Sequence, residues 1–484
     1  MDSNETHILV PQRTLPVADK VDVLVCGGGV AGIAAAVSAA RNGARTLLIE
    51  RAGFLGGTAT GSSMGLIVIP AGELAGFPRE FFARLAAEQG AALGEAVPWD
   101  IEAYKWTAMS FLKEAGAELL LYTWVSEPIM EAGRIAGVVV ENKSGRQAIL
   151  ARTVIDTTGD GDVAARAGAA FVKGREEDGA MRPVTVMGRI GNIDLGAMLE
   201  YQAAHPGDFV DDDGRRARNL EAGVVLIDGF FEAIRKGREA GIVSASNPLN
   251  CIRFSGVKRR ESMDRAILIC NSTRVYDVDA TVASDITRAE FEGRRQLREV
   301  VELCRRHVPG CERSFLVDTS AYLGVRETRR IKGRRTLTYE DIRDRRPVED
   351  SIAVISHHDY GSADTHGSAI AYDSAHAHIA PPSRMLRFEF PLSCLLPESV
   401  GNLLVAGRCA SVTHDVDKFS RNMAPTGLVG QAAGLVAAVM ARAPEADWSR
   451  IPVRDIQARL EAQGVPVHLA DSRPAAPAAM PSRE

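Results

Sequence analysis

The sequence predicts an α/β fold: a domain with a parallel sheet and a β-meander, into which an α+β domain is inserted. Three observations predict it. Residues 21–50 alternate strand, glycine-rich turn, helix and strand, and residues 117–156 form short apolar runs separated by turn residues. From about residue 176 the chain changes to polar helices and isolated strands, before a buried strand returns near residue 402. We therefore expect a first domain at 20–175 that resumes at 396–445, an inserted domain at 176–395, and a C-terminal helix and disordered tail at 446–484.

The strongest pattern is DVLVCGGGVAGIAAAVSAARNGARTLLIE at 22–50. Residues 21–26 are apolar, rich in β-branched side chains and bounded by glycines, which favours a buried parallel strand. Residues 31–41 are mainly Ala, Ile and Val, which favours a helix covered on most sides, and Asn42-Gly43 resembles a C-cap. A second strand is expected at 45–49.

The turn between this strand and helix predicts a dinucleotide site. Gly27, Gly29 and Gly32 supply G-x-G-x-x-G, and Glu50 ends the second strand. The glycines let the helix N-terminus approach a pyrophosphate, while the acid is placed to hold a ribose diol. Because Glu50 would repel a 2′-phosphate, NADP is disfavoured here. The sequence contains no second G-x-G-x-x-G, so we expect no dedicated NAD(P)H domain.

The remaining elements follow in order. Helices are expected at 79–92 and at 100–115 with Asp100 as N-cap, then a strand at 117–125 and the β-meander. The meander ends in VIDTTGDGD, at the sheet edge where ligands bind. In the inserted domain, Thr287 and Glu290 suggest a capping box. The first domain is expected to resume with a strand and glycine turn at 402–412, followed by a small-residue helix at 424–441.

Composition restricts the class of protein. The net charge of −5 provides no bulk attraction to nucleic acid or to an anionic membrane. No run approaches the roughly 18 to 20 apolar residues that span a bilayer, and residues 1–20 lack a signal-peptide pattern. We expect a cytoplasmic protein with no nucleic-acid partner and no membrane span. The seven cysteines are scattered without a C-x-x-C pair, which predicts reduced, mostly buried thiols.

With these blocks in view, the chain resembles the bacterial FAD-dependent oxidoreductases of the glutathione-reductase-like flavoprotein superfamily. The matching segments are GGGVAG (27–32) with Glu50, LGGT (55–58), VIDTTGDGD (154–162), YLGVRETRRIKG (322–333) and NLLVAGRCAS…H…R…GLVGQAAG (402–434). The likeness spans roughly residues 20–440 and is specific for FAD but weak for substrate. It implies a Rossmann-like FAD-binding domain and an inserted substrate or cap domain.

The resemblance also implies which residues hold FAD. The first glycine motif and Glu50 would hold the ADP half, the GGT loop would follow the pyrophosphate and flavin, and Val125 would lie beside the adenine. The last helix would direct amides around Gly427 at flavin N1 and O2, where a helix N-terminus stabilises negative charge; packing on the sheet is the alternative role. The cofactor-binding candidates are Gly27, Gly29, Val30, Ala31, Gly32, Glu50, Arg51, Gly56, Gly57, Thr58, Val125, Gly159, Asp160, Gly407, Arg408, Gly427, Leu428 and Val429.

His414 and Arg421 flank the last flavin-binding turn and are the leading catalytic candidates. The histidine would exchange a proton with a C–OH or C–NH group, or it is a polar residue bonded to backbone. Arg421 would hold a carboxylate or the flavin. Arg326 belongs to a basic run that reaches Arg346. Such a run is usually a solvated or interface face, whereas the resemblance places Arg326 in a pocket near the flavin.

The segment SHHDYGSADTHGSAIAYDSAHAH (356–378) holds five of the ten histidines. It is a polar surface segment, a substrate-facing loop or a metal site; its spacing fits no metal motif, and we predict no metal. His358 is its catalytic candidate, by analogy with the family. Cys409, beside the last glycine turn, is either a covalent flavin anchor or, as we expect, a packed thiol.

The leading hypothesis is a flavoenzyme that transfers a hydride between flavin N5 and a small polar, possibly carboxylate-bearing, substrate. Its electron acceptor would be oxygen, a quinone or a carrier protein, and the enzyme is a candidate homo-oligomer. The alternatives are a flavin monooxygenase that uses external NAD(P)H, a tRNA-modifying flavoprotein and a non-catalytic binding module. The acidic balance counts against the tRNA alternative, and the retained FAD motifs count against the binding module.

Overall fold

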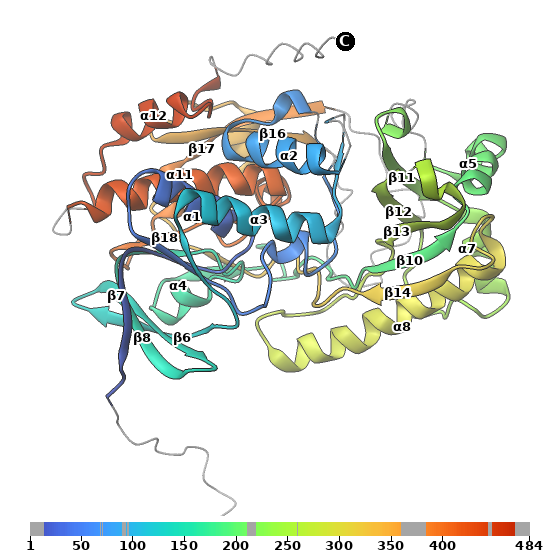
Figure 1. Ribbon diagram of the computed structural model, residues 1–484, viewed down its shortest axis with the longest axis horizontal. Helices are drawn as coiled ribbons and strands as arrows, with labels where there is room; N and C mark the ends of the chain where they lie inside the picture. Colours follow the sequence, from blue (N-terminus) through green and yellow to red (C-terminus); the bar gives the residue numbers. More distant parts are fainter. Residues whose placement is uncertain are drawn as a thin grey trace, which may run out of the picture.

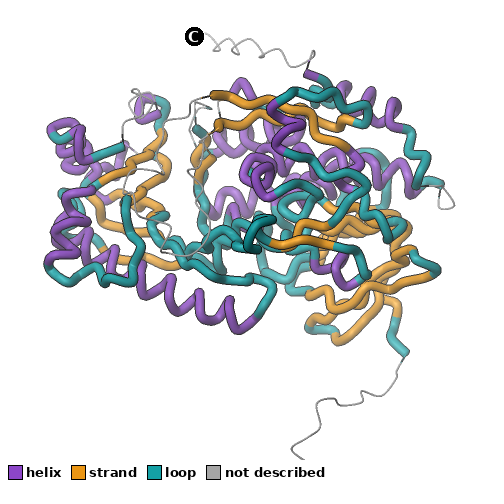
Figure 2. Tube along the Cα trace, turned by 180° about the vertical axis from the view of Figure 1, so that it is seen from behind, coloured by secondary structure: helices purple, strands orange, loops and turns teal. Residues whose placement is uncertain are grey.

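The computed structural model describes residues 14–67, 69, 71–89, 93, 96–210, 219–258, 260–359, 384–443 and 448–469. The chain forms two lobes (Figure 1). Segments from both ends of the chain build one lobe, and residues from about 184 to 325 build the other. A view from behind shows that each lobe has its own sheet (Figure 2).

A seven-stranded sheet with the order β5-β2-β1-β8-β7-β6 forms the base of the first lobe, and β18 pairs with β8. Strands β5, β2, β1, β8 and β18 run parallel, whereas β6, β7 and β8 form an antiparallel meander. The strands are β1 (Val17–Cys26), β2 (Thr46–Ile49), β5 (Glu118–Leu120), β6 (Trp124–Glu131), β7 (Arg134–Asn142), β8 (Gly145–Asp156) and β18 (Leu403–Val405). The predicted parallel sheet with a β-meander is confirmed.

Helix α1 (Val30–Arg41) lies beside α11 (Met423–Ala441), although almost 400 residues separate them (Figure 1). Both consist mainly of small and apolar residues, so their backbones approach closely. Among the described residues, α11 is the one helix long and apolar enough to cross a membrane by length and composition. However, 89% of its apolar window is buried inside the protein, as in a core helix.

Helices α2 (Gly76–Glu88) and α3 (Ile101–Ala115) cover the same lobe with an aromatic layer of Phe77, Phe81, Phe111 and Tyr104. The Asp100 side chain accepts hydrogen bonds from the amides of Glu102 and Ala103, which confirms the predicted N-cap. Helix α2 begins at Gly76, earlier than the residue 79 that apolar periodicity suggested.

The second lobe is α+β, as predicted. Its antiparallel sheet has the order β11-β12-β13-β10-β14, with helices packed on one face around a separate core. The elements are β10 (Gly188–Ile193), α5 (Leu195–Ala204), β11 (Val224–Gly229), α7 (Phe231–Glu239), β12 (Ile252–Val257), β13 (Ala266–Cys270), α8 (Ala283–His307) and β14 (Phe315–Thr319). The predicted capping box is wrong: α8 already begins at Ala283, and the Thr287 hydroxyl donates to the Ala283 carbonyl inside the helix.

The chain then returns to the first lobe. Apolar residues between 337 and 396 belong to the core of α1 and α11, and β16 and β17 lie across α11 (Figure 1). The remaining elements are β3 (Leu66–Ile67), β4 (Val97–Pro98), α4 (Asp162–Arg166), β9 (Phe171–Lys173), β15 (Arg329–Ile331), α9 (Tyr339–Arg343), β16 (Ser351–Asp359), β17 (Arg384–Pro391), α10 (His414–Ser420) and α12 (Val453–Ala462). We infer that the inserted domain ends near residue 330 and not at 395.

The seven cysteines are all among the described residues, and all are free thiols. Six of them are buried and Cys251 is half-buried. This burial agrees with the predicted packed thiols.

Candidate cofactor and active site

The first glycine turn joins β1 to α1, and its shape excludes side chains at Gly27 and Gly32. Gly27 has a φ of +109°, and a Cβ there would lie 2.6 Å from the Thr157 carbonyl oxygen. A Cβ on Gly32 would lie 1.8 Å from the Gly27 oxygen. By contrast, a Cβ on Gly29 would meet only the Cα of Gly57, at 3.9 Å, so the outer side of the turn is open. The open side of the turn, next to the first amides of α1 at Val30 and Ala31, is where the sequence predicts the pyrophosphate.

Glu50 follows β2 and is held rigidly beside this turn. Its side chain is buried, with Oε2 accepting a hydrogen bond from the Gly28 amide at 2.6 Å and Oε1 accepting one from the Ala52 amide at 2.8 Å. Each carboxylate oxygen can accept a second hydrogen bond. The residue therefore fits the role of ribose acceptor that its spacing predicts.

The GGT loop lies directly against the first turn. Gly56 pairs with Gly29 in a parallel bridge, and the amide of Gly56 donates to the Gly28 carbonyl at 2.8 Å. A Cβ on Gly57 would lie 2.9 Å from the Gly29 Cα. Thr58 lies in the short helix η1 (Gly57–Ala59) that follows. The fold thus brings together two predicted cofactor segments that are separated in the sequence.

Two further predicted segments meet through one side chain. Arg408 donates from Nη2 to Asp160 Oδ1 at 2.6 Å and from Nε to the Gly159 carbonyl at 3.0 Å. Gly407, just before it, packs on Ala31 of α1. The turn after β18 is therefore tied both to the turn after β8 and to the first glycine turn. All four segments lie at the carboxyl edge of the parallel sheet.

The Arg51 guanidinium lies over two aromatic rings, 5.3 Å from the Trp124 centroid and 5.5 Å from that of Tyr322. The Tyr322 hydroxyl donates to the Gly57 carbonyl at 3.1 Å. Sequence reasoning did not single out Tyr322, although it opens the YLGVRETRRIKG segment. Val125 lies in β6, and its carbonyl accepts a hydrogen bond from Arg166.

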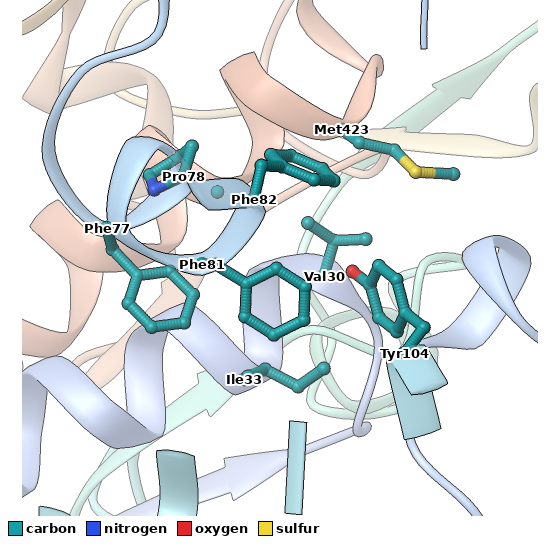
Figure 3. Close-up of a pocket in the computed structure, with 9 residues that line it drawn as sticks. Val30, Ile33, Phe77, Pro78, Phe81, Phe82, Tyr104 and Met423 are labelled. Atoms are coloured by element: carbon teal, nitrogen blue, oxygen red, sulfur yellow. The ribbon is translucent and has the colours of Figure 1, made fainter. Parts of the chain in front are cut away.

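Gly427, Leu428 and Val429 lie in the second turn of α11, which begins at Met423 after Asn422 as N-cap. Gly427 packs against Pro78, and Leu428 and Val429 are buried. This part of α11 borders an apolar crevice that α1, α2 and α3 complete (Figure 3). Its lining residues are Val30, Ile33, Phe77, Pro78, Phe81, Phe82, Tyr104, Met423 and Gly427. The packing role of α11 is thus visible, and its amide role remains a prediction.

His414 is the first residue of α10 and is 2% exposed. Its Nδ1 lies 2.8 Å from Oε1 of Glu327, a carboxylate that is itself 1% exposed. Arg330 donates to the same Oε1, and the Arg182 amide donates to Oε2 at 3.2 Å. The Arg182 guanidinium donates to the His414 carbonyl at 2.8 Å. His414 is therefore bonded to a charged side chain, in contrast to the simple backbone-bonded alternative.

Asp417, one turn further along α10, is 0% exposed. Its Oδ2 lies 3.3 Å from Arg182 Nε and 3.4 Å from Arg421 Nε. Burial raises the pKa of Asp417 in spite of the two arginines. Burial also acts to raise the pKa of Glu327, but the hydrogen bond from His414 and the neighbouring arginines hold it below its ordinary value. The pKa values of these two buried carboxyl groups are thus shifted in opposite directions.

Sequence reasoning missed Arg182, Glu327, Arg330 and Asp417. The available signal was weak: Glu327 and Arg330 are three residues apart in VRETRR, as are His414 and Asp417 in HDVD. Arg326 lies at the edge of this cluster and donates to the Pro183 carbonyl at 2.6 Å.

The histidine-rich segment is described only in part, because residues 360–383 lie outside the described residues. His358 is in β16 opposite Met385. Its neighbour His357 is buried, and its Nε2 is hydrogen-bonded to Asn422, the N-cap of α11. Within the described part of the chain, no group of three or more His, Cys, Asp or Glu side chains is arranged for a metal ion.

Cys409 is fully buried, and burial raises the pKa of its thiol well above the ordinary value. A raised pKa disfavours the reactive thiolate. This environment supports the packed-thiol interpretation.

A strand, glycine turn and helix with an acid after the next strand, and two more turns at the same sheet edge, define a dinucleotide-binding enzyme fold. Residues 22–460 match the model of a family described as FAD dependent oxidoreductase. The chain belongs to this family: it is an FAD-dependent oxidoreductase, and FAD is its cofactor. The finer superfamily assignment remains a prediction.

Curated relatives match a limited part of the chain. The thiamine thiazole synthase of Methanococcus vannielii is 32% identical over 163 residues, which are 29% of this chain and 56% of the relative. The enzyme of the same name from Methanococcus maripaludis is 32% identical over 161 residues, with the same coverage. The chain thus spans about half the length of the curated relatives it matches.

Solved structures match over nearly the whole chain. A geranylgeranyl bacteriochlorophyll reductase-like protein from Thermoplasma acidophilum is 13% identical, with a TM-score of 0.46, over 94% of this chain and 86% of that one. The myxobacterial chondrochloren halogenase is 13% identical, with a TM-score of 0.45, over 91% of this chain and 79% of that one.

Proposed function

We propose that this enzyme transfers a hydride between its flavin and a small polar substrate, and that carboxylate-bearing compounds are the first class to test. One observation carries the proposal. His414, Asp417 and Arg421 stand on the short segment immediately before α11, which packs on the α1 helix of the first glycine turn. A proton-transfer group and a cation thus lie close in the chain to the predicted flavin end of the cofactor site.

In this proposal, separate residues bind the cofactor, transfer the proton and orient the substrate. The glycine turns and Glu50 hold the dinucleotide, and bound FAD supplies a hydride acceptor or donor. His414 exchanges a proton with a C–OH or C–NH group of the substrate. Arg421, whose side chain is 14% exposed, orients a substrate carboxylate.

The sequence also bears on the molecule that exchanges electrons with the flavin. A second dinucleotide motif is missing from the sequence, so we propose oxygen, a quinone or a carrier protein as acceptor. We also propose that the protein is located in the cytoplasm.

Anaerobic bleaching of the bound flavin tests the proposal. The purified enzyme is mixed with hydroxy acids, amines, polyols and enones, before and after chemical reduction. Bleaching of the oxidised form by a hydroxy acid or amine, or reoxidation of the reduced form by an enone, supports hydride transfer and shows its direction. Bleaching by NAD(P)H alone, with no reaction toward the whole panel, supports the monooxygenase alternative instead.

A further inference from the structure

The Glu327 carboxylate and the His414 imidazole form a buried pair that joins the end of the inserted domain to the first lobe, which holds the glycine turns and is called the cofactor lobe below. We propose that Glu327 is a positioning residue, which fixes His414 in the tautomer with its proton on Nδ1 and leaves proton exchange with substrate to Nε2. The inference rests on the proposed role of His414 in proton transfer.

The contacts of Glu327 determine which atom carries the proton. Its oxygens accept from the Arg330 guanidinium and from the Arg182 amide, in addition to the contact with His414 Nδ1. A carboxylate that is paired with arginine and accepts three hydrogen bonds is ionised. An ionised carboxylate only accepts hydrogen bonds, so the proton in the His414–Glu327 contact belongs to Nδ1.

The imidazole is fixed from its backbone side as well. His414 begins α10 directly after the N-cap Thr413, and its carbonyl accepts from Arg182 Nη2 at 2.8 Å. Arg182 therefore contacts both members of the pair, through its amide on Glu327 and its guanidinium on His414. A ring held in this way loses little freedom when a proton is transferred.

Charged groups surround the imidazole from several segments. Arg182 lies before β10, Glu327 and Arg330 lie at β15, and Asp417 and Arg421 lie on or after α10. Asp178 is also within electrostatic reach: chiefly Arg175, and to a smaller extent His414, lower the pKa of its carboxyl to about 2. Among these groups, Glu327 is the carboxylate bonded to the ring.

Removal of the Glu327 charge should change the protonation of His414 in a predictable direction. In Glu327→Gln the arginines remain and the bonded anion is lost, so the imidazolium form of His414 becomes less stable. The inflection of the pH–rate profile that His414 governs should therefore move to lower pH. The rate of flavin reduction should fall by about 10² to 10⁴, as when a catalytic histidine loses its orienting carboxylate.

A purely structural role for Glu327, the neutralisation of Arg330 and Arg182, makes a different prediction. With such a role, loss of the Glu327 charge would alter folding and FAD content but would not change which ring nitrogen of His414 carries the proton. The matched control is Glu176→Gln, because Glu176 is an exposed carboxylate 3.9 Å from Arg330. This control removes a charge near Arg330 without touching the pair.

The decisive experiment is ¹⁵N NMR of histidine-labelled holoenzyme, with the His414 signals assigned by their loss in His414→Gln. The wild type should show a protonated Nδ1 and an unprotonated Nε2 at high pH. Glu327→Gln should lose this preference and titrate at lower pH, and Glu176→Gln should match the wild type. A wild-type proton on Nε2, or a Glu327→Gln titration equal to wild type, overturns the inference.

A variant that fails to fold and an unchanged reduction rate can each be interpreted. If Glu327→Gln does not fold with FAD, the wild-type tautomer alone decides the question. If the tautomer is as stated but His414→Ala reduces its flavin at the wild-type rate, the pair is correct and the proposed proton-transfer role of His414 is wrong.

Discussion

Gly430 of α11 lies so close to Ala31 of α1 that a Cβ on the glycine would stand 2.3 Å from the Ala31 carbonyl oxygen. One turn later, a Cβ on Gly434 would stand 2.1 Å from the Ala35 oxygen. The helix that follows the first glycine turn is thus in backbone contact with α11, which comes from near the other end of the chain. This contact sets the distance between the two halves of the lobe.

Gly430→Val should separate these helices and destabilise the protein. The obstacle is backbone, which cannot rotate away, so we expect a loss of about 1–3 kcal/mol or more in the free energy of unfolding. Urea denaturation measures it. Gly207→Ala is the control, because a Cβ at Gly207 meets nothing within 4 Å. Equal stability of the two variants would show that the helices do not pack this closely.

Gly29→Glu should yield folded protein without FAD. The space outside Gly29 is open, so a side chain fits there, but a carboxylate would occupy and repel the pyrophosphate position. Flavin absorbance after denaturation gives the FAD content, and circular dichroism checks the fold. Stoichiometric FAD in this variant would mean that the dinucleotide does not cross this turn.

His414→Ala should keep its FAD, because the predicted cofactor contacts lie in other segments. Flavin reduction by substrate should slow by about 10² to 10⁴, the range for loss of a general acid or base. Stopped-flow absorbance under anaerobic conditions measures the rate, with Asp415→Asn, an exposed neighbour, as control. An unchanged rate would direct attention to His357 and His358.

Arg421→Ala should weaken the binding of a carboxylate-bearing substrate more than it slows turnover. Loss of a charge-assisted contact raises KM, with a cost of about 1.5–3 kcal/mol. Steady-state kinetics against the acid and its amide separate the effects, because the amide should bind both enzymes alike. A similar loss for acid and amide would contradict a carboxylate contact.

Asp417→Asn should stabilise the protein at neutral pH. Burial raises the pKa of Asp417 in the folded state, so its contribution to stability is fully present below the unfolded pKa and is lost as pH rises through the folded pKa. Asparagine resembles the protonated acid and avoids this loss. Urea unfolding at pH 7 should show a gain, which disappears below about pH 4. Destabilisation at pH 7 would show that the Asp417 charge is needed by Arg182 and Arg421.

Much of the cofactor lobe was predictable, because its signals are local. An apolar run, a turn that only glycine can form at Gly27, and a helix of small residues each depend on a few consecutive residues. Asp100 caps α3 as its spacing indicates. The Thr287–Glu290 pattern failed for a related reason: a local motif is one of several ways to begin a helix, and α8 begins at Ala283 instead, upstream of its first buried residue, Ala289.

The sequence by itself determined the order of strand, glycine turn, helix and acid, and with it the class of cofactor. Only the tertiary structure decided the surroundings of His414. Glu327 is 87 residues and Arg182 is 232 residues from His414 along the chain, and both reach it because the ends of the inserted domain meet at α10. Backbone preferences and apolar periodicity act over a few residues, so they mark the elements in the sequence. The partners of a buried charge are set by how distant segments pack, since the cost of desolvation is offset only where opposite charges meet.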